Sequence, residues 1–447
     1  MRNSRRSFLF GAAGTAALLA GSGARAAAQT PYACTPPNPT GVAPTPWRRP
    51  ESALVQRSAA WSLTSTDANT TKLRHAYAIM QSLPASNPHS MAAQRNMHAW
   101  YCNDCGSIDT HEEIHGSYKF LAWHRAFLYF HERILGKLID DATLRLTYYD
   151  WEHPLHRALP PIYAAASQPL WHKRVLTPPS PIAPAEIFNG VPGMMNYAVD
   201  DFFGTVTAGG SVEARPHNKG HVSIGDDMGV LNTAAFDPIF YSHHGNVDRM
   251  WASWQRLHPG QQPSGTAYSA IRFAFWDENK RWVSIGVNDV SDTRSLGYEY
   301  SAFITPPSRA LRSTIPLTLT SPSRLGSAPA ANAFSGADTV DVRLENLQIP
   351  GDEGNYTVQA VTPDGKVHDI GIFSSIPHVR AGAMNMARDL RSVNLVLPVA
   401  PALAATISVA GTTFRVRRTS ARGIGLLQAA PPQITPAHIG AISLVVR

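Results

Sequence analysis

The stretch that decides the fold runs from residue 215 to residue 254. It reads R-P-H-N-K-G-H at 215–221 and, after a loop, D-P-I-F-Y-S-H-H-G-N-V-D-R-M-W-A-S-W at 237–254. His217 and His221 are four residues apart, so on a helix both imidazoles project from one face and can bind one metal ion. The second half predicts another helix, opened by its D-P pair, from which His244 can add a third nitrogen. Three histidines without a thiolate suit copper, zinc, iron or nickel.

A second histidine-rich stretch lies upstream. H-G-S-Y-K-F-L-A-W-H-R-A-F-L-Y-F-H-E-R-I-L begins at His115 and reaches His124 nine residues later. Apolar residues at spacings of three and four predict a helix over 123–138. With His98 across a loop, His115 and His124 form a second candidate trio. Any single one of the 18 histidines is more often a surface or core residue, but two trios, each beside an aromatic-rich helix, predict two metal sites.

Length and composition indicate a globular chain with a large core. It has 447 residues, 44% of them hydrophobic and 16% charged, which favours two or three domains. The formal net charge of +7 is inflated by four arginines in residues 1–28, which contain no acidic residue. Without those four there are 35 basic and 32 acidic residues, a net charge of +3, and no further basic run. The composition therefore argues against nucleic-acid binding.

Residues 1–28 predict an export signal. S-R-R-S-F-L at 4–9 carries a twin arginine, a Gly/Ala/Leu run follows to about Ala20, and A-R-A at 24–26 has the small residues of a cleavage site. The run is too short and too rich in Gly and Ala for a membrane span, and we expect no span elsewhere. These features predict a periplasmic or secreted protein with the twin-arginine export machinery as a partner. A disordered basic tail is the alternative.

The histidine motifs resemble those of type 3 copper proteins, and specifically plant-type polyphenol oxidases (tyrosinase and catechol oxidase). Residues 123–141 resemble the family's copper A helix, and residues 216–221 with 237–251 resemble its copper B pair. F-W-D-E-N-K-R-W-V at 275–283 and D-T-R-S-L-G-Y-E-Y at 292–300 resemble the segment that follows the plant catalytic domain. The resemblance covers most of the chain. It implies two copper ions in a binuclear centre that uses O2 to oxidise small phenols.

The resemblance also implies which residues hold the copper ions. The ligands would be His98, His115 and His124 for copper A, and His217, His221 and His244 for copper B. His243 competes with His244 for the last place. The wider family keeps this ligand seven residues after the Asp of the D-P pair, which selects His244 and leaves His243 beside the site as a gate.

Three cysteines are an odd number, so at least one is not in a disulfide with another. Plant-type enzymes cross-link a cysteine four residues after the first copper A histidine to the second one, and Cys102 and His115 match that pattern. The resemblance thus implies a Cys102–His115 thioether and leaves Cys34 and Cys105 for a disulfide. Plant enzymes place the corresponding half-cystine next to the first histidine, where this chain has Ala99, so a Cys34–Cys102 pairing stays open.

Two further residues bear on the proton of a phenol. Glu213 lies four residues before His217, and Asn218 follows that histidine directly. In tyrosinases that hydroxylate monophenols, the matching Glu and Asn hold a water that deprotonates the phenol, which is general-base catalysis. The presence of both Glu213 and Asn218 predicts o-hydroxylation of monophenols as well as oxidation of o-diphenols to o-quinones. A solvated loop carboxylate is the alternative for Glu213.

The substrate mouth departs from the plant pattern at one position. Plant enzymes often carry a Phe thirteen residues before the last copper B ligand, and Leu231 takes that place here. A Leu widens the mouth and removes a stacking partner. Val222, directly after His221, is small and apolar and should permit access. Asp248, one turn after His244, could accept a hydrogen bond near the ligands or form a surface salt bridge.

The expected fold is a mainly α catalytic domain, a helical bundle holding the dicopper site, over residues 29–305. Residues 51–62 and 69–83 are its first predicted helices. A linker rich in Ser, Pro and Ala follows over 306–335. Residues 336–447 hold roughly seven β-like runs separated by turn residues, which predicts a β-sandwich. In related enzymes a C-terminal β domain covers the copper mouth until it is removed. We expect the same shielding here, with a plain stability or interaction domain as the alternative.

Three other functions fit part of the sequence. A catechol oxidase would lack the hydroxylation of monophenols. A haemocyanin-like oxygen carrier shares both histidine trios but covers its site so that phenols cannot enter. A zinc hydrolase built on HxxxH would usually carry a Glu within the motif, where this chain has N-K-G at 218–220. A copper chaperone would be a further partner, and no residue identifies one.

Overall fold

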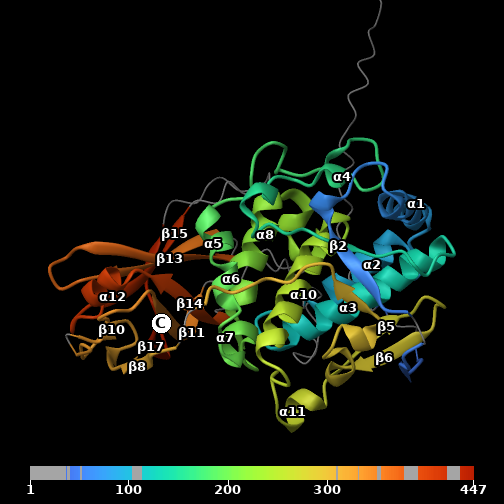
Figure 1. The fold of residues 1–447 in the computed structure, drawn as a ribbon. Helices are drawn as coiled ribbons and strands as arrows, with labels where there is room; N and C mark the ends of the chain where they lie inside the picture. The colour runs from blue at the N-terminus through green and yellow to red at the C-terminus, as the bar shows by residue number, and fades with distance from the viewer. Residues whose placement is uncertain are drawn as a thin grey trace, which may run out of the picture. The chain divides into compact units, whose positions relative to one another are not determined.

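The computed structural model describes residues 37, 41–50, 53–102, 113–308, 311–330, 332–349, 354–376, 391–419 and 433–447. In these ranges, helices predominate before about residue 270 and strands after it, as Figure 1 shows. The export signal predicted at 1–28 and the disulfide predicted between Cys34 and Cys105 lie outside the described residues. None of the helices in the described ranges is long and apolar enough to cross a membrane.

The helical part is built around four helices that carry or flank the histidine motifs. They are α2 (Met91–Tyr101), α3 (Lys119–Leu138), α8 (Asn218–Ile224) and α10 (Ile239–Leu257). Around them lie α1 (Ala68–Ser82), α4 (Pro161–Ala164), α5 (Ala185–Asn189), α6 (Val191–Met194), α7 (Val199–Phe203), α9 (Leu231–Ala234) and α11 (Thr266–Ser269). Helix α3 begins four residues before the predicted start, so His124 lies in its second turn.

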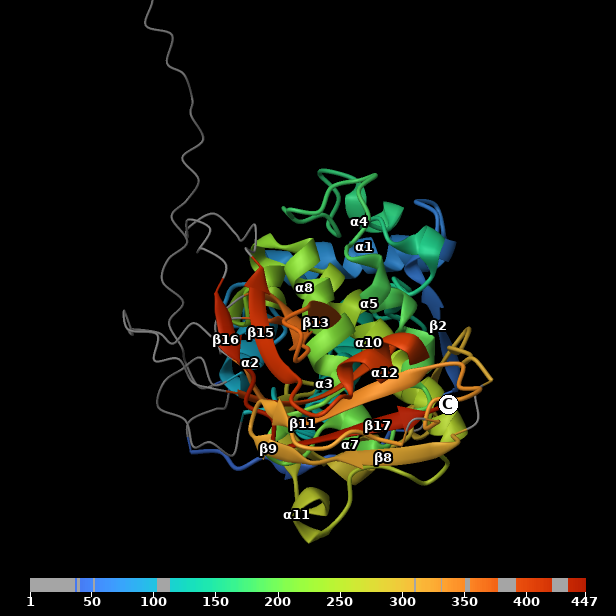
Figure 2. The same cartoon turned by 90° about the vertical axis from the view of Figure 1, so that its left-hand side faces the viewer.

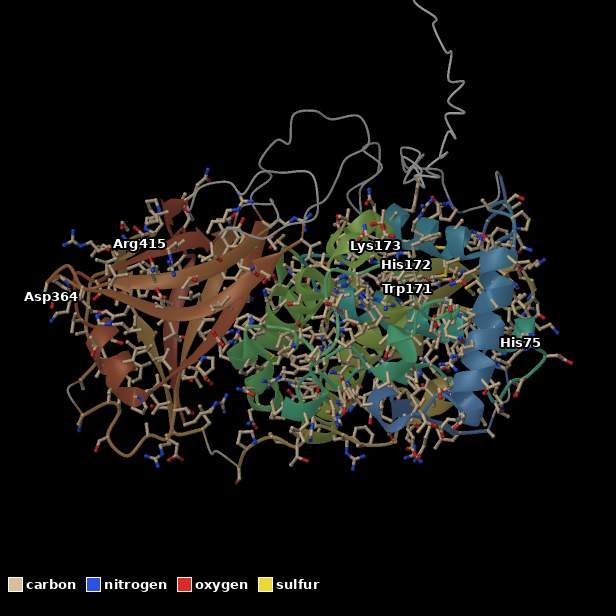
Figure 3. All side chains as sticks on the ribbon, turned by 90° about the horizontal axis from the view of Figure 1, so that it is seen from above. His75, Trp171, His172, Lys173, Asp364 and Arg415 are labelled. Atoms are coloured by element: carbon tan, nitrogen blue, oxygen red, sulfur yellow. The ribbon has the colours of Figure 1, made fainter. Side chains whose placement is uncertain are left out.

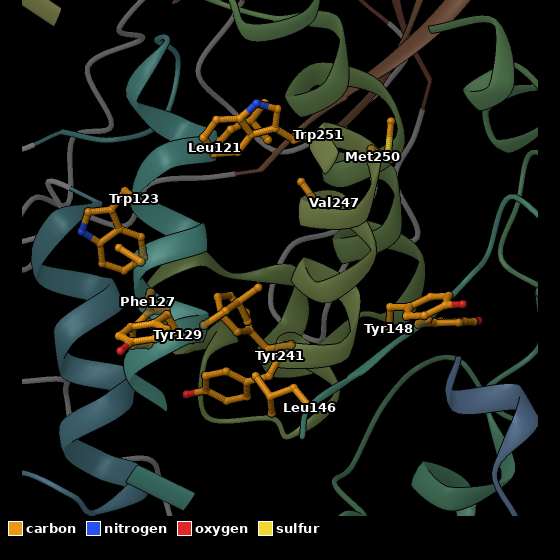
Figure 4. Packing of buried hydrophobic residues seen from close by; sticks show 14 of the residues in the cluster. Leu121, Trp123, Phe127, Tyr129, Leu146, Tyr148, Tyr241, Val247, Met250 and Trp251 are labelled. Carbon is orange, nitrogen blue, oxygen red and sulfur yellow. The ribbon is translucent and has the colours of Figure 1, made fainter. Parts of the chain in front are cut away.

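The core around α3 and α10 is aromatic. Trp123 and Phe127 of α3 and Tyr241 and Trp251 of α10 are all 0–1% exposed (Figure 4). Each buried side chain of this size stabilises the fold by roughly 1.5–3 kcal/mol relative to exposure. A helix buried on nearly every side needs apolar residues all round, which explains why the two histidine motifs are embedded in aromatic sequence.

The first predicted helix is wrong. Within residues 51–62 the structure has strand β2 (Val55–Ala59) and a single 3₁₀ turn (Ala60–Ser62). Strand β2 pairs in parallel with β3 (Thr147–Tyr148) on one side and β7 (Tyr298–Tyr300) on the other. A short apolar run does not distinguish a strand from a helix, and here partners remote in sequence decided the outcome. The other small sheet has the order β1-β6-β5, formed by β1 (Thr45–Pro46), β6 (Trp282–Gly286) and β5 (Arg272–Trp276).

The C-terminal part is a pair of β-sheets, as predicted. One sheet has the order β13-β12-β15-β10-β9 with β16 paired to β15, and the other has the order β4-β14-β11-β17-β8. Their strands are β8 (Ser313–Leu317), β9 (Leu319–Ser321), β10 (Arg324–Leu325), β11 (Val340–Ile349), β12 (Gly354–Val361), β13 (Val367–Ser375), β14 (Arg391–Val399), β15 (Thr413–Thr419), β16 (Ile434–Pro436) and β17 (Ala441–Val446), with helix α12 (Pro401–Ile407) after β14. Val358 and Phe373 of the first sheet share one apolar core with Leu344 and Leu397 of the second.

Two short segments link the chain's halves. The stretch 306–335, predicted as a linker, contributes β8, β9 and β10, which enter both sheets. These strands have two to five residues, too few for alternation to be read from a Ser/Pro-rich sequence. Strand β4 (Ala208–Gly209) comes from the helical part and pairs in parallel with Ser392 and Val393 of β14. The helical part thus supplies an edge strand of the C-terminal sandwich.

Candidate metal centre

The predicted ligands gather in two clusters. One contains His98 from α2, His115 from the turn before α3 and His124 from α3 itself. The other contains His217 from the residue just before α8 and His221 from α8 itself, with His243 and His244 from α10. Within each cluster the potential ligand atoms all lie within 4.8 Å of one another. All six predicted ligands therefore lie in the expected trios, and His243 joins the second.

Main-chain carbonyls set the orientation of three of these rings. The Nδ1 atoms of His98 and His124 are each 2.8 Å from a carbonyl, those of Leu231 and Phe120 respectively. Nδ1 of His221 is 2.6 Å from the carbonyl of Met228. Because a carbonyl only accepts, each Nδ1 carries the hydrogen, and the lone pair lies on Nε2. These three carbonyls direct the Nε2 atoms towards the cluster.

The Nε2 lone pairs of these buried rings fit a metal ion. Among the described residues, the buried Nε2 atoms of His124 and His217 have no hydrogen-bond partner. Nε2 of His221 lies only 3.2 Å from Nε2 of His244. Burial lowers the pKa of His124 and His217 well below the ordinary value and that of His221 to about 4, so the rings are neutral. Buried acceptors without donors are costly, and a cation bound by neutral imidazoles, as copper is, satisfies them.

The two clusters adjoin each other. The rings of His124 and His244 are stacked, with centroids 4.1 Å apart and planes 7° from parallel. The rings of His115 and His217 have centroids 6.2 Å apart. Two ions held by these clusters would be close neighbours, which suits a binuclear centre rather than two independent sites.

The contacts of His243 differ from those of His244. Nδ1 of His243 accepts a hydrogen bond of 3.1 Å from Nε1 of Trp151. A Cβ added to Gly220 would lie 2.3 Å from Cε1 of His243, so the glycine in the HxxxH motif makes room for this ring. His244 instead stacks on a copper A candidate and faces His221.

A loop braces the segment that orients His221. His172 bonds Asp227 at 2.6 Å, and Lys173 pairs with Asp226 at 2.8 Å; both loop residues are labelled in Figure 3. The two aspartates belong to the 3₁₀ turn Asp226–Gly229, whose Met228 carbonyl holds His221. The sequence motifs gave no sign of this support.

Glu213 is buried at the centre rather than solvated. It is 5% exposed and begins a π-helical turn (Glu213–His217) just before α8. Its two carboxylate oxygens accept the Gly116 N–H at 2.8 and 3.0 Å, which ties it to the residue following His115. Burial raises the pKa of Glu213 to about 8, although the Gly116 N–H and the charge of Arg391 act in the opposite direction. The alternative of a solvated loop carboxylate is therefore wrong.

Two of the three predicted gate residues, Leu231 and Val222, meet the C-terminal part, whereas His243 contacts Trp151. Leu231 is 1% exposed and packs with Cys102, Val222 and Ile376, the residue that follows β13. Cys102 Sγ lies 3.5 Å from Nε2 of His98. The sequence did not single out Ile376, because an isolated isoleucine after a strand carries no signal of its own.

A small cavity remains between the two parts. Its lining from the helical part includes His115, Glu213, Asn218 and Leu231, and its lining from the C-terminal part includes Ile349, Ile376, Arg391 and Val393. Its volume is about 20 Å³, which is room for one water molecule and far too little for a phenol ring.

Asp248 serves a structural purpose. It is 3% exposed and accepts hydrogen bonds from Arg125 Nε at 2.5 Å, from Tyr298 at 2.6 Å and from Tyr300. It therefore ties α10 to α3 and to β7, inside the molecule rather than at a surface salt bridge.

Comparison with known proteins agrees with this geometry. The common central domain of tyrosinase matches residues 85–192 and 189–257, and the polyphenol oxidase middle domain matches residues 270–310. A crystal structure of polyphenol oxidase from Grenache grapevine (Vitis vinifera) is 32% identical, with a TM-score of 0.56, over 62% of this chain and 93% of the grapevine chain. The chain belongs to the plant-type polyphenol oxidase family of type 3 copper proteins. The two histidine clusters are consistent with the binuclear copper centre of this family.

Other relatives extend the match. The latent form of polyphenol oxidase from Prunus armeniaca is 33% identical over 316 residues, covering 61% of this chain and 52% of the relative. Polyphenol oxidase B from Solanum lycopersicum is 33% identical over 62% of this chain and 54% of its own. The chain thus spans about half the length of the curated relatives it matches. Latent apple tyrosinase, 23% identical with a TM-score of 0.64, shares the fold over 91% of this chain and 99% of its own.

The comparisons contradict the predicted periplasmic or secreted location. The relatives from Prunus armeniaca, Solanum lycopersicum, Vitis vinifera and Spinacia oleracea are named as chloroplastic. A chloroplastic location implies plastid targeting rather than bacterial twin-arginine export. A basic, Ala-rich leader with a twin arginine does not by its composition separate these routes, because plastid transit peptides are also basic and poor in acid.

Proposed function

We propose that the protein is a copper-dependent phenol oxidase that uses O2 to convert o-diphenols to o-quinones. The observation that carries the proposal is the pair of adjacent clusters of buried, neutral histidines with Nε2 lone pairs directed inward. The residues that would hold the metal are His98, His115 and His124 for one ion and His217, His221 and His244 for the other. When bound, the copper pair supplies the transfer of two electrons from the phenol to O2.

Two finer assignments belong to this centre. We assign the sixth ligand to His244, because His243 is already bonded to Trp151 through Nδ1. The Cys102–His115 thioether stays part of the proposal. It would fix the orientation of the His115 ring, and it would use the cysteine that the expected disulfide leaves over.

Glu213 and Asn218 would handle the substrate proton. A catechol loses two protons together with two electrons, and a monophenol must lose its hydroxyl proton before its ring is hydroxylated. Glu213, held by the Gly116 N–H, offers a carboxylate oxygen at the cavity, and Asn218 lines the same cavity. A water between them would pass the proton from the phenol to Glu213, which is the work of a general base. This arrangement favours monophenolase besides diphenolase activity.

The C-terminal β domain would keep the enzyme latent. Support comes from the cavity, whose 20 Å³ leaves no space for a phenol while Ile376 packs on Leu231 and Val222. We assign the role of plug to Ile376, with Leu231 and Val222 forming the mouth that it closes.

Copper content and oxygen uptake test the proposal. We expect two copper ions per chain and oxygen uptake with catechol, and more slowly with tyrosine, once mild denaturant has opened the β domain. One zinc and no copper would end the proposal, and no uptake with either phenol would favour an oxygen carrier. Uptake with catechol alone would support a catechol oxidase, a candidate favoured by the burial of Glu213, which raises the pKa of this carboxyl and so opposes its ionisation.

Peptide mass spectrometry tests the thioether separately. A tryptic peptide pair joined between Cys102 and His115, lighter by two hydrogens than the sum of its parts and stable to thiol reduction, is the expected result. Two separate peptides, with Cys102 open to alkylation in the denatured copper-loaded protein, would rule the cross-link out.

A further inference from the structure

Helix α8, which carries His221 and follows His217 directly, is held by the β domain through polar bonds. Asn218 donates from Nδ2 to the main-chain carbonyl of Ser374 at 2.8 Å, and Lys219 donates from Nζ to Oδ1 of Asn355 at 2.9 Å. Oγ of Ser374 donates to the same Asn355 oxygen at 2.9 Å. Two consecutive residues at the start of α8 are thus bound to two adjacent strands, β12 and β13. Figure 2 shows β13 beside α8.

The orientation of the Asn218 amide is fixed at both ends. Its Oδ1 lies 2.9 Å from Nδ1 of His217 and accepts from it, and its Nδ2 must then face the opposite way, towards Ser374. The same side chain lines the small cavity together with Glu213. An N–H of the Asn218 amide could hold a water between Asn218 and Glu213. The Ser374 carbonyl accepts a hydrogen bond from the same amide nitrogen and so competes with that water.

We propose that the β domain keeps the enzyme latent with a polar lock as well as with the Ile376 plug. The polar lock is the Ser374 carbonyl on the Asn218 amide, supported by Asn355. It rests on the proposed function, in which Asn218 takes part in deprotonating the phenol. Both devices stabilise the closed form, in which the plug excludes an aromatic ring. The polar lock in addition withdraws an N–H that hydroxylation of monophenols needs.

Substitution of Asn355 tests the polar lock without touching the catalytic domain. Asn355→Ala removes the acceptor that Lys219 and Ser374 share, and a buried donor without its acceptor disfavours the closed form. We expect the full-length, copper-loaded variant to oxidise catechol about tenfold faster than the wild type before any activating treatment, which corresponds to a shift of about 1.4 kcal/mol in the closed–open equilibrium. Asn355→Asp keeps the acceptor and should stay latent. Val367→Ala, on the exposed beginning of β13, is the matched control.

Ile376→Ala separates the plug from the polar lock. Because the Ser374 carbonyl still holds Asn218 in this variant, catechol oxidation should rise several times more than tyrosine hydroxylation. Adding Asn355→Ala should then raise the hydroxylation. If Ile376→Ala alone increases both activities by the same factor, the polar lock is overturned.

Hydrogen exchange provides a readout that does not depend on activity. In the copper-free full-length protein, peptides covering 213–224 should exchange faster in Asn355→Ala than in Asn355→Asp or Val367→Ala. Peptides from β17 report whether the sandwich itself is intact. Unchanged exchange together with unchanged latency in Asn355→Ala would overturn the polar lock. Faster exchange with no phenol oxidised even after denaturant would support the polar lock and instead overturn the proposed function.

Discussion

At the scale of single residues, the environment of Glu213 has a consequence for stability. Burial raises its pKa to about 8, so the folded protein keeps this proton where an exposed Glu has lost it. Between the ordinary Glu pKa and about pH 8 the unfolded chain therefore binds fewer protons than the folded one, and stability falls as pH rises. Urea unfolding of the copper-free protein should show the wild type losing about 1.4 kcal/mol per pH unit relative to Glu213→Gln in this window. Parallel pH profiles of the two proteins would contradict this.

Gly209 controls the position of the same carboxylate. A Cβ added to Gly209 would lie 2.9 Å from Oε2 of Glu213 and 3.2 Å from Cα of Gly116. We expect Gly209→Ala to displace Glu213 and to reduce tyrosine hydroxylation at least tenfold, while catechol oxidation, measured after denaturant activation, changes less than twofold. Gly193→Ala is the control, because nothing lies within 4 Å of its added Cβ. An equal loss of both activities would mean that the substitution harms the centre as a whole.

At the scale of elements, Asp248 should decide how firmly α3, α10 and β7 hold together. Its carboxylate faces Arg57 and Arg125, both 0% exposed. Replacing it takes the carboxylate from Arg125, while Arg57 keeps its ion pair with Glu132 at 2.9 Å. We expect Asp248→Asn to cost about 3–5 kcal/mol of unfolding free energy. Asp369→Asn removes an exposed pair with Arg417 and should cost no more than about 1 kcal/mol. Chemical denaturation followed by fluorescence of the buried tryptophans measures both, and similar midpoints for the two variants would contradict the assignment.

The histidine trios could be predicted because ligand chemistry constrains spacing along the chain. His217 and His221 sit one helical turn apart, and α10 starts after its D-P pair as expected. Three further ligands, His98, His124 and His244, were predictable because each lies in an aromatic stretch that has to be buried. Local sequence was sufficient to predict a ligand wherever the histidine lies within a single helical motif.

What the sequence could not supply comes from pairing across long distances. The local pattern predicted a helix where strand β2 lies. The strands that pair with β2, which are β3 and β7, are far away in the sequence and leave no local signal. Ile376, Ser374 and Arg391 reach the metal centre only through the register of the C-terminal sheets. No motif marks them, because their position depends on how two domains dock rather than on their own chemistry.

At the scale of the whole molecule, cutting the connection between the parts should not by itself activate the enzyme. Strand β4 remains paired with β14, and Ser211 of the helical part exchanges hydrogen bonds of 3.0 Å with the Asn394 carbonyl and the Val396 N–H. A chain nicked between residues 305 and 312 should therefore stay latent as a two-fragment complex at high concentration. Activity should rise as the complex is diluted and dissociates.

Size-exclusion chromatography and oxygen uptake over a dilution series measure this together. The uncut protein, whose latency should not depend on dilution, is the control. Full activity immediately after nicking, with the fragments still eluting together, would show that the covalent connection and not the contact surface maintains latency.

Strand β4 also determines the fate of a β domain that has been shed. Release removes the two-residue edge strand that covers Ser392 and Val393, and β14 is left with unpaired main-chain N–H and carbonyl groups. A bare sheet edge is a template for another strand. Light scattering should therefore increase as activation proceeds, because the released β domains pair with one another through this edge. A cell that activates the enzyme is then left with a fragment that is prone to aggregate.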